Sequence, residues 1–159
     1  MEGSAARFYL RKDYIKMEKY PCVIRGVEQK VPNVVPGTPI YANAVTVDNL
    51  IFVSGMTAQT FEDGSCLTNT AQDQTRVCYT KLKKVLEEAG SSLDNLVRTL
   101  ILFKDMRDYP VVRATEYEFF KEHAPSLVDA PPASTVLQAA SLARPEFLVE
   151  IEAIAVVKK

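Results

Sequence analysis

Residues 70–105, TAQDQTRVCYTKLKKVLEEAGSSLDNLVRTLILFKD, contain a strong helix signal followed directly by the signal of a buried strand. Thr70 and Asp73 have the spacing of a helix-capping box, with Asp in place of the usual Glu or Gln. Apolar residues then recur at helical spacing until Gly90, which is typical of a helix end. The apolar run at 97–105 predicts a strand. This stretch therefore predicts a helix followed by a strand.

Two further strands are expected on the N-terminal side of that helix. IYANAVTV at 40–47 and LIFVSG at 50–55 are short and rich in apolar and β-branched residues. Asp48 and Asn49 lie between them and are typical of a two-residue hairpin turn. The two segments therefore predict an antiparallel hairpin.

A second helix and two closing strands are expected on the C-terminal side. Asp108 is a suitable N-cap, and Pro110 is tolerated in the first helical turn. The apolar stripe of this helix, which Glu116 interrupts, consists of Val112, Phe119 and Phe120. Strands are expected near 133–140 and at 147–157.

The resulting order is β-β-α-β-α-β-β, which predicts an α+β domain with both helices on one face of a mixed sheet. In the last strand, alternation gives one face Val149, Ile151, Ala153, Ala155 and Val157, and the other Glu150, Glu152, Ile154 and Val156. Both faces therefore carry apolar side chains. Because a monomer rarely exposes such a patch, we expect the face without helices to meet another subunit.

The N-terminal part of the chain has a different character. Residues 1–36 are interpreted as an extension or arm, and 37–159 as the folded domain. The segment 20–31 could hold one extra strand. The first residues have no apolar core of the kind found in a secretory signal, and no apolar run approaches the ~20 residues of a membrane helix.

Composition excludes several classes of function. Nineteen basic and twenty acidic residues give a net charge of −1, so nothing in the balance suggests a nucleic-acid or membrane surface. The chain has three dispersed cysteines without a CxxC motif, a single histidine, His123, and no glycine-rich phosphate loop. We therefore expect no metal site, no cofactor, and reduced thiols in the cytoplasm.

Several segments together resemble the RidA/YjgF family. They are Tyr41 with Asn43, the run 50–55, the stretch 71–109 and, most specifically, VEIEAIAV at 149–156. The resemblance extends from about residue 37 to 157 without a large gap. It implies a chorismate-mutase-like fold and a homotrimer with ligand clefts between neighbouring subunits.

The resemblance also implies an activity. Well-known members hydrolyse reactive imines and enamines, such as 2-aminoacrylate, to ketones and ammonia without a cofactor. We therefore expect a deaminase-like enzyme acting on a small conjugated imine or enamine, for example an aminomuconate-like compound. The alternative is a diverged member that binds a small molecule or partner protein without turnover. A ribonuclease role has weak support, because neither a basic patch nor a histidine pair is visible.

Site residues follow from the resemblance position by position. The cleft tyrosine of the family corresponds to Tyr41, and its serine–glycine pair corresponds to Ser54 and Gly55. The cleft glutamate corresponds to Glu150, which we expect to be catalytic. A partly desolvated carboxylate at this point would have a raised pKa suited to proton transfer with water.

The sequence departs from the family in two places. Where deaminase members read P-A-R-S, this chain has Ser134 and Thr135 after Pro-Ala, so the arginine that grips a substrate carboxylate is replaced by serine. Small imino acids are therefore expected to be poor substrates, and Ser134 and Thr135 are expected to bind a neutral or longer one. On the second helix, Arg113 and Glu116 replace the usual asparagine and tyrosine.

Two questions remain open from the sequence. Arg113 can reach the cleft and restore a positive charge there, or it can pair with Glu116 or Glu118 on the helix surface. Glu150 can act on water, or it can make structural hydrogen bonds as expected for Glu152.

Overall fold

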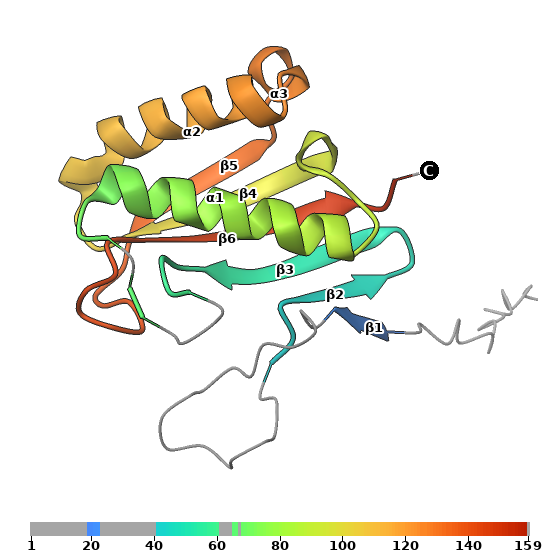
Figure 1. Ribbon diagram of the computed structural model, residues 1–159, viewed down its shortest axis with the longest axis horizontal. Helices are drawn as coiled ribbons and strands as arrows, with labels where there is room; N and C mark the ends of the chain where they lie inside the picture. Colours follow the sequence, from blue (N-terminus) through green and yellow to red (C-terminus); the bar gives the residue numbers. More distant parts are fainter. Residues whose placement is uncertain (1–18, 23–40, 61–64, 67, 159) are drawn as a thin grey trace, which may run out of the picture.

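The order of the strands in the sheet differs from their order in the chain. The computed structural model describes residues 19–22, 41–60, 65–66 and 68–158. Its six-stranded sheet has the order β1-β2-β3-β6-β4-β5 (Figure 1). The strands are β1 Lys19–Cys22, β2 Ala44–Val47, β3 Leu50–Met56, β4 Leu96–Phe103, β5 Ala133–Gln138 and β6 Val149–Val156. Only β4 and β5 pair in parallel, so the sheet is mixed as predicted.

Two long helices pack on one face of this sheet. The helices are α1 Ala71–Glu88, α2 Tyr109–His123 and the short α3 Ser126–Asp129, with single 3₁₀ turns at Leu93–Asn95 and Met106–Asp108. The α+β class and the placement of both main helices on one face are confirmed (Figure 1). The strands expected at 40–47, 133–140 and 147–157 are shorter than predicted, because apolar alternation runs a few residues past their hydrogen-bonded ladders.

The local signals for the hairpin and for α1 are present as expected. Asp48 adopts φ 54° between β2 and β3, whose ends Val47 and Leu50 are paired. At the start of α1, the Thr70 side chain accepts a hydrogen bond of 3.1 Å from the backbone N–H of Asp73. Gly90 follows the helix with φ 79°, a conformation that glycine adopts without strain.

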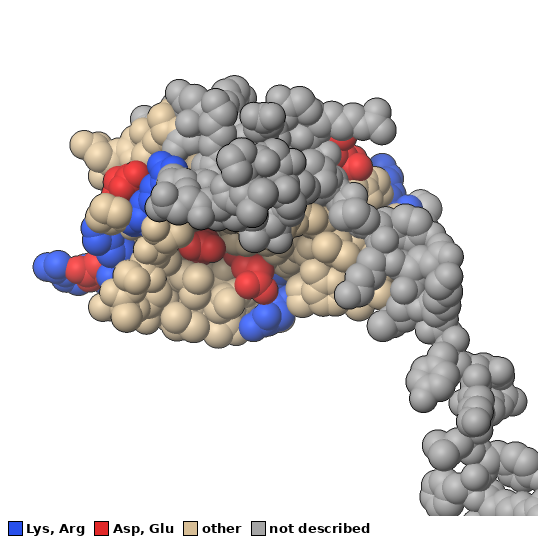
Figure 2. All heavy atoms as spheres, turned by 90° about the horizontal axis from the view of Figure 1, so that it is seen from below, with Lys and Arg blue, Asp and Glu red and all other residues tan. Residues whose placement is uncertain are grey.

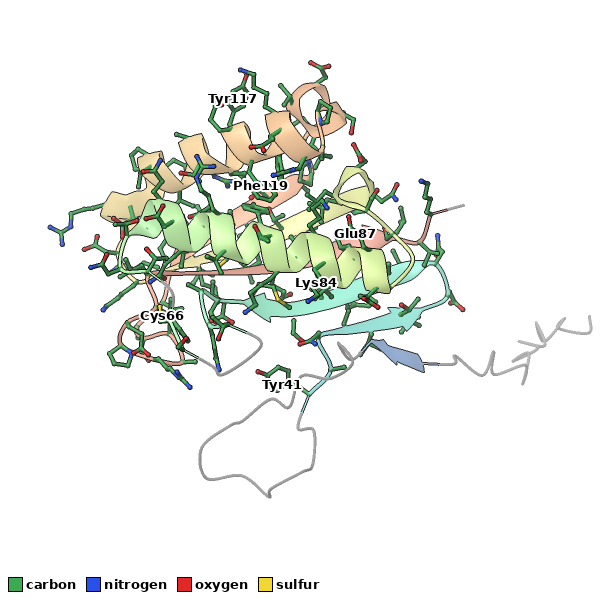
Figure 3. The ribbon with its side chains drawn as sticks, viewed as in Figure 1. Tyr41, Cys66, Lys84, Glu87, Tyr117 and Phe119 are labelled. Atoms are coloured by element: carbon green, nitrogen blue, oxygen red, sulfur yellow. The ribbon has the colours of Figure 1, made fainter. Side chains whose placement is uncertain are left out.

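The core lies between the helices and the sheet. Its β6 contribution is the predicted apolar face, from Val149 to Ala155. Tyr79 of α1 is fully buried, with ring-centroid distances of 5.6 Å to Phe119 and 5.2 Å to Phe120 of α2. Figure 3 shows Phe119 directed toward α1, whereas Tyr117 points away from the sheet. Aromatic contacts therefore join the two helices above the sheet.

The face of the sheet without helices is partly apolar. On β3, Phe52 is 44% exposed and pairs with Ile154 of β6, while Leu50 pairs with Val156. Glu150, on the same face of β6, pairs with Leu102 of β4. An exposed apolar surface of this kind is typical of a face that contacts another protein surface.

The strand β1 belongs to the predicted N-terminal arm. It pairs antiparallel with β2 and so extends the sheet at one edge. The expected strand region 20–31 overlaps it only in part, and the remainder of that region and most of the arm lie outside the described residues. Among the described helices, none has the length and apolar character needed to cross a membrane.

Candidate functional site

The predicted site residues separate into two groups that do not meet within one chain. The Glu150 group consists of Ser54, Gly55 and Glu150, at the β3–β6 junction, and of Tyr41, in the segment before β2 that Ser54 joins to β3. Arg113 and Ser134 lie instead between α2 and β5, on the helix side of the sheet. Strands β3 and β5 are separated by β6 and β4, which corresponds to about 14 Å at ordinary strand spacing. Figure 3 shows Tyr41 near β2, well away from α2.

Within the first group, Gly55 makes room for the Glu150 carboxylate. A β-carbon added at Gly55 would lie 1.9 Å from Glu150 Oε1 and 2.8 Å from its Cδ. The ladder between β3 and β6 is irregular between Val53 and Met56, and Gly55 lies in this bulge. The bulge and the missing side chain together allow the carboxylate to lie directly against the β3 backbone.

The Glu150 carboxylate is half-buried. Among the described residues, no group donates a hydrogen bond to it. Burial raises the pKa of Glu150, the nearby charge of Glu152 raises it further, and the Lys81 ammonium opposes both. Lys81 itself donates hydrogen bonds to the carbonyl oxygens of Thr57 and Gln59, at 2.9 and 2.7 Å. Glu150 is therefore a carboxylate that takes up a proton more readily than an ordinary glutamate.

Ser54 and Tyr41 differ in how firmly they are held. The Ser54 hydroxyl donates to the Ala42 carbonyl at 2.7 Å, and the Ser54 N–H donates to the Asn43 carbonyl at 2.9 Å. Ser54 thus fastens the segment before β2 to β3. Tyr41, in that segment, is 51% exposed, so its ring is available to a ligand or a neighbouring subunit.

In the second group, Arg113 pairs with Glu116, as one of the sequence-based alternatives expected, and it also donates to Ser134. Its Nη1 lies 2.5 Å from Glu116 Oε2, and its Nη2 donates to Ser134 Oγ at 2.8 Å. Glu116 is buried rather than on the helix surface. Burial lowers and pairing with Glu116 raises the pKa of Arg113, with a net upward shift. A guanidinium therefore lies beside Ser134.

Tyr79 and Thr99 extend this group, and the sequence interpretation did not include them. The Tyr79 hydroxyl donates a short hydrogen bond to Glu116 Oε1, and the buried Thr99 hydroxyl donates to Ser134 Oγ at 2.9 Å. Tyr79 lies on the apolar side of α1, and Thr99 lies on the apolar side of β4. A polar side chain within an apolar pattern is a sequence signal that could have identified them. Glu116 shows the same signal in the apolar stripe of α2.

Thr135 joins neither group. Ser134 and Thr135 point to opposite faces of β5, because side chains alternate along a strand. Thr135 pairs with Leu100, which also pairs with Glu152, and so Thr135 lies on the face without helices. The sequence treated Ser134 and Thr135 as one binding unit, and the structure does not bring them together.

Other nucleophiles and ligand sets are not supported by the described residues. Burial raises the pKa of the Cys78 thiol to about 12, so it stays protonated at neutral pH. His123 lies in the last turn of α2, with its ring 4.4 Å from that of Phe119. No cluster of three or more potential metal ligands occurs within the described part of the chain. On the face drawn in Figure 2, acidic and basic side chains are intermixed.

Comparison with known proteins places this arrangement in a family. The family model described as "Endoribonuclease L-PSP" matches residues 35–157, which is most of the chain. The chain belongs to the RidA/YjgF/L-PSP family. Within it, the chain is 32% identical over 116 residues to a 2-iminobutanoate/2-iminopropanoate deaminase of Escherichia coli, covering 73% of this chain and 86% of that protein.

Two further relatives extend the comparison. The protein mmf2, mitochondrial, of Schizosaccharomyces pombe is 38% identical over 117 residues, covering 72% of this chain and 86% of that protein. Among solved structures, the YjgF gene product of Escherichia coli superposes with a TM-score of 0.66 at 30% identity, covering 78% of this chain and 91% of the other. These likenesses confirm the family and the fold that the sequence indicated.

Proposed function

We propose that the protein is a cofactor-free hydrolytic deaminase acting on small imines or enamines, with Glu150 as the group that moves protons. The observation that carries the proposal is the Glu150 carboxylate itself, half-buried against Gly55, with a raised pKa and no hydrogen-bond donor among the described residues. A partly desolvated carboxylate with a raised pKa is suited to accept a proton from water and pass it on. The identity to an Escherichia coli imine deaminase supports the same chemistry.

The reaction needs only water as co-reactant. The Glu150 carboxylate takes a proton from water as the water oxygen bonds to the imine carbon, and it passes this proton to the nitrogen. In the resulting carbinolamine, Glu150 takes the hydroxyl proton and delivers it to the amine as the carbon–nitrogen bond breaks. Ammonia leaves and a carbonyl group remains, with Glu150 again ionised.

Arg113 and Ser134 are proposed to bind the substrate. The expectation that small imino acids are poor substrates rested on the serine at the family's arginine position. The Arg113 guanidinium lies 2.8 Å from Ser134 Oγ and restores a positive charge at that place. We therefore include carboxylate-bearing imines in the substrate class, from 2-iminobutanoate to aminomuconate-like compounds. Tyr41, Ser54 and Gly55 line the Glu150 side.

The two groups can serve one substrate only if neighbouring subunits bring them together. Arg113 and Glu150 lie on opposite faces of the sheet within a chain, and the exposed apolar face around Phe52 offers a contact surface. We propose a homotrimer whose clefts combine the Glu150 group of one chain with Arg113 and Ser134 of the next. Light scattering should give three times the mass of the chain, and a stable monomer at micromolar concentration would exclude this shared cleft.

The activity test uses 2-iminobutanoate formed in the cuvette from L-2-aminobutanoate by an amino-acid oxidase. The protein should shorten the lifetime of the imine relative to its spontaneous hydrolysis, with release of ammonia and 2-oxobutanoate. The same assay with an aminomuconate-like compound tests the longer substrate. Absence of acceleration for both compounds would contradict the proposal.

A second function has a specific observation in its favour. The charge of Arg113 is already balanced by Glu116, so the group has less attraction for an anion than a lone arginine. This favours a protein that binds a small molecule or partner without turnover. Saturable binding of 2-oxobutanoate without imine hydrolysis would support this alternative over the deaminase.

A further inference from the structure

Five side chains from four elements form one continuous set of hydrogen bonds between the helices and β5. Tyr79 of α1 donates to Glu116 of α2, and Glu116 accepts from Arg113, one turn away. Arg113 then donates to Ser134 of β5, which also accepts from Thr99 of β4. We call these residues the Arg113 network. It begins in the core and ends at the surface, where Ser134 is exposed.

The network determines which hydrogen-bonding role Ser134 can offer to a ligand. A serine hydroxyl has two acceptor lone pairs and one proton to donate. Arg113 Nη2 and Thr99 Oγ1 occupy the two acceptor positions, at 2.8 and 2.9 Å. The remaining capacity of Ser134 is its O–H. A ligand therefore meets Ser134 as a donor.

Arg113 offers donors at the same place. A guanidinium has five N–H donors in a rigid plane, and those directed at Glu116 and Ser134 account for part of them. The Arg113 guanidinium carbon lies over the Tyr109 ring, 5.5 Å from the ring centroid, so the ring covers one face of the guanidinium. The Arg113 side chain is 25% exposed, so part of this fork reaches solvent beside Ser134. Two adjacent donors with one positive charge match a carboxylate.

The core end of the network keeps Glu116 in place. Burial and the neighbouring Glu116 charge raise the pKa of Tyr79 well above its ordinary value, so its hydroxyl always has a proton to donate. With Tyr79 on Oε1 and Arg113 on Oε2, both Glu116 oxygens have a partner. The carboxylate is thereby fixed, and it fixes the guanidinium in turn.

We propose that Tyr79, Glu116 and Thr99 are positioning residues that hold Arg113 and Ser134 as a preset donor pair for a substrate carboxylate. The proposal rests on the proposed function only for the identity of the substrate, and it assigns the recognition of the acid group to a helix-borne arginine. The positioning residues act through Arg113 and Ser134 and do not touch the ligand.

The test uses variants that keep the net charge constant, so that a change in affinity reports geometry. Thr99→Val and Tyr79→Phe each remove one buried donor, and Thr80→Val and Tyr117→Phe are their controls at exposed positions of α1 and α2. Dissociation constants are measured by calorimetry on the full chain for 2-oxobutanoate and for its neutral amide. Circular dichroism verifies that each variant is folded.

The wild type should bind the acid more tightly than the amide. Thr99→Val and Tyr79→Phe should each weaken binding of the acid by about tenfold and leave the amide unchanged, which corresponds to one misaligned hydrogen bond. With 2-iminobutanoate, the same loss should appear in KM rather than kcat. If Tyr79→Phe does not fold, the affinities of Thr99→Val for the acid and the amide decide whether the positioning proposal holds.

Equal binding of acid and amide by the wild type, or equal losses for both ligands in the variants, would overturn the proposal. Failure of the positioning proposal and failure of the deaminase proposal give different results. Acid-selective binding without imine hydrolysis would leave the positioning proposal standing and refute the deaminase. Imine hydrolysis with an unchanged KM in Thr99→Val would refute the positioning role alone.

Discussion

The Glu150 group and the Arg113 network contain one carboxylate each, half-buried in the first and buried in the second, and the two differ in their hydrogen bonds. Glu116 has a partner on both oxygens, from Tyr79 and Arg113, and its charge is neutralised. Glu150 is half-buried, has a raised pKa, and receives no hydrogen bond from the described residues. Desolvating a carboxylate without donors, as at Glu150, favours its protonated form.

Because of this difference, we expect the two regions to have different roles. A carboxylate whose two oxygens both accept hydrogen bonds, as in Glu116, holds its neighbours in place. A half-buried carboxylate with a raised pKa and no donor among the described residues is suited to accept a proton from water. Changes at Glu150 are therefore expected to affect turnover, and changes in the Arg113 network to affect binding and stability.

The largest effect is expected from Glu150→Gln. The amide keeps the shape of the side chain and cannot exchange a proton, so kcat for 2-iminobutanoate should fall by roughly 10²–10⁴-fold. Thermal stability should not fall, because an unfavourably buried charge is removed. Glu152→Gln is the matched control on the same face of β6 and should stay near wild-type activity. Small, equal effects from both substitutions would make Glu150 a structural residue.

A smaller effect is expected from Gly55→Ala. The new β-carbon would lie 1.9 Å from Glu150 Oε1, so the flexible carboxylate must move aside. Displacement of about 1 Å should lower kcat by about tenfold to a hundredfold without unfolding the protein. Because the substitution acts through Glu150, the double variant with Glu150→Gln should lose no more activity than Glu150→Gln alone. Additive losses would show that Gly55 acts in another way.

The third prediction concerns the stability of the Arg113 network. Tyr79→Phe leaves one oxygen of the buried Glu116 without its donor, so the free energy of unfolding should fall by about 1–3 kcal/mol. Tyr117→Phe, at a ring that is 50% exposed, should change it by less than about 0.5 kcal/mol. Urea denaturation of both variants measures the difference. Equal stabilities would mean that the hydrogen bond to Glu116 contributes little.

The smallest effect is a pH shift at Glu150. Its raised folded-state pKa means that the ionised base is lost at a higher pH than for an ordinary glutamate, so kcat should decline as the pH falls through that value. Removing the Glu152 charge lowers this pKa, and Glu152→Gln should move the acid limb of the profile to lower pH. An unmoved limb would show that another group sets it.

The raised pKa of Glu150 has the opposite pH dependence for stability: it lowers the free energy of unfolding as the pH rises, whereas it lowers kcat as the pH falls. The folded state binds the Glu150 proton more readily than the unfolded state. The contribution of Glu150 to stability therefore falls as the pH rises from the ordinary pKa of a glutamate through the raised pKa of the folded state. Glu150→Gln should remove that decline. Unfolding followed at a series of pH values for both proteins measures it.

The sequence by itself determined the elements whose signals are local. The capping residues Thr70 and Gly90 predicted the limits of α1, and Asp48 with Asn49 predicted the hairpin turn. Alternation along β6 correctly separated the core-facing residues from Glu150. Such features depend on backbone geometry and side-chain period within a few residues, so a single sequence is enough to reveal them.

Only the tertiary structure decided how the site residues are distributed. Tyr79 contacts Glu116, 37 positions further along the chain, because α1 packs against α2. Arg113 of α2 contacts Ser134 of β5, 21 positions further along. Ser134 and Thr135 are neighbours in the sequence, and both were expected to bind the substrate. Their side chains point to opposite faces of the sheet. Contacts of this kind depend on which faces of distant elements are buried together, and no local pattern in the chain contains that information.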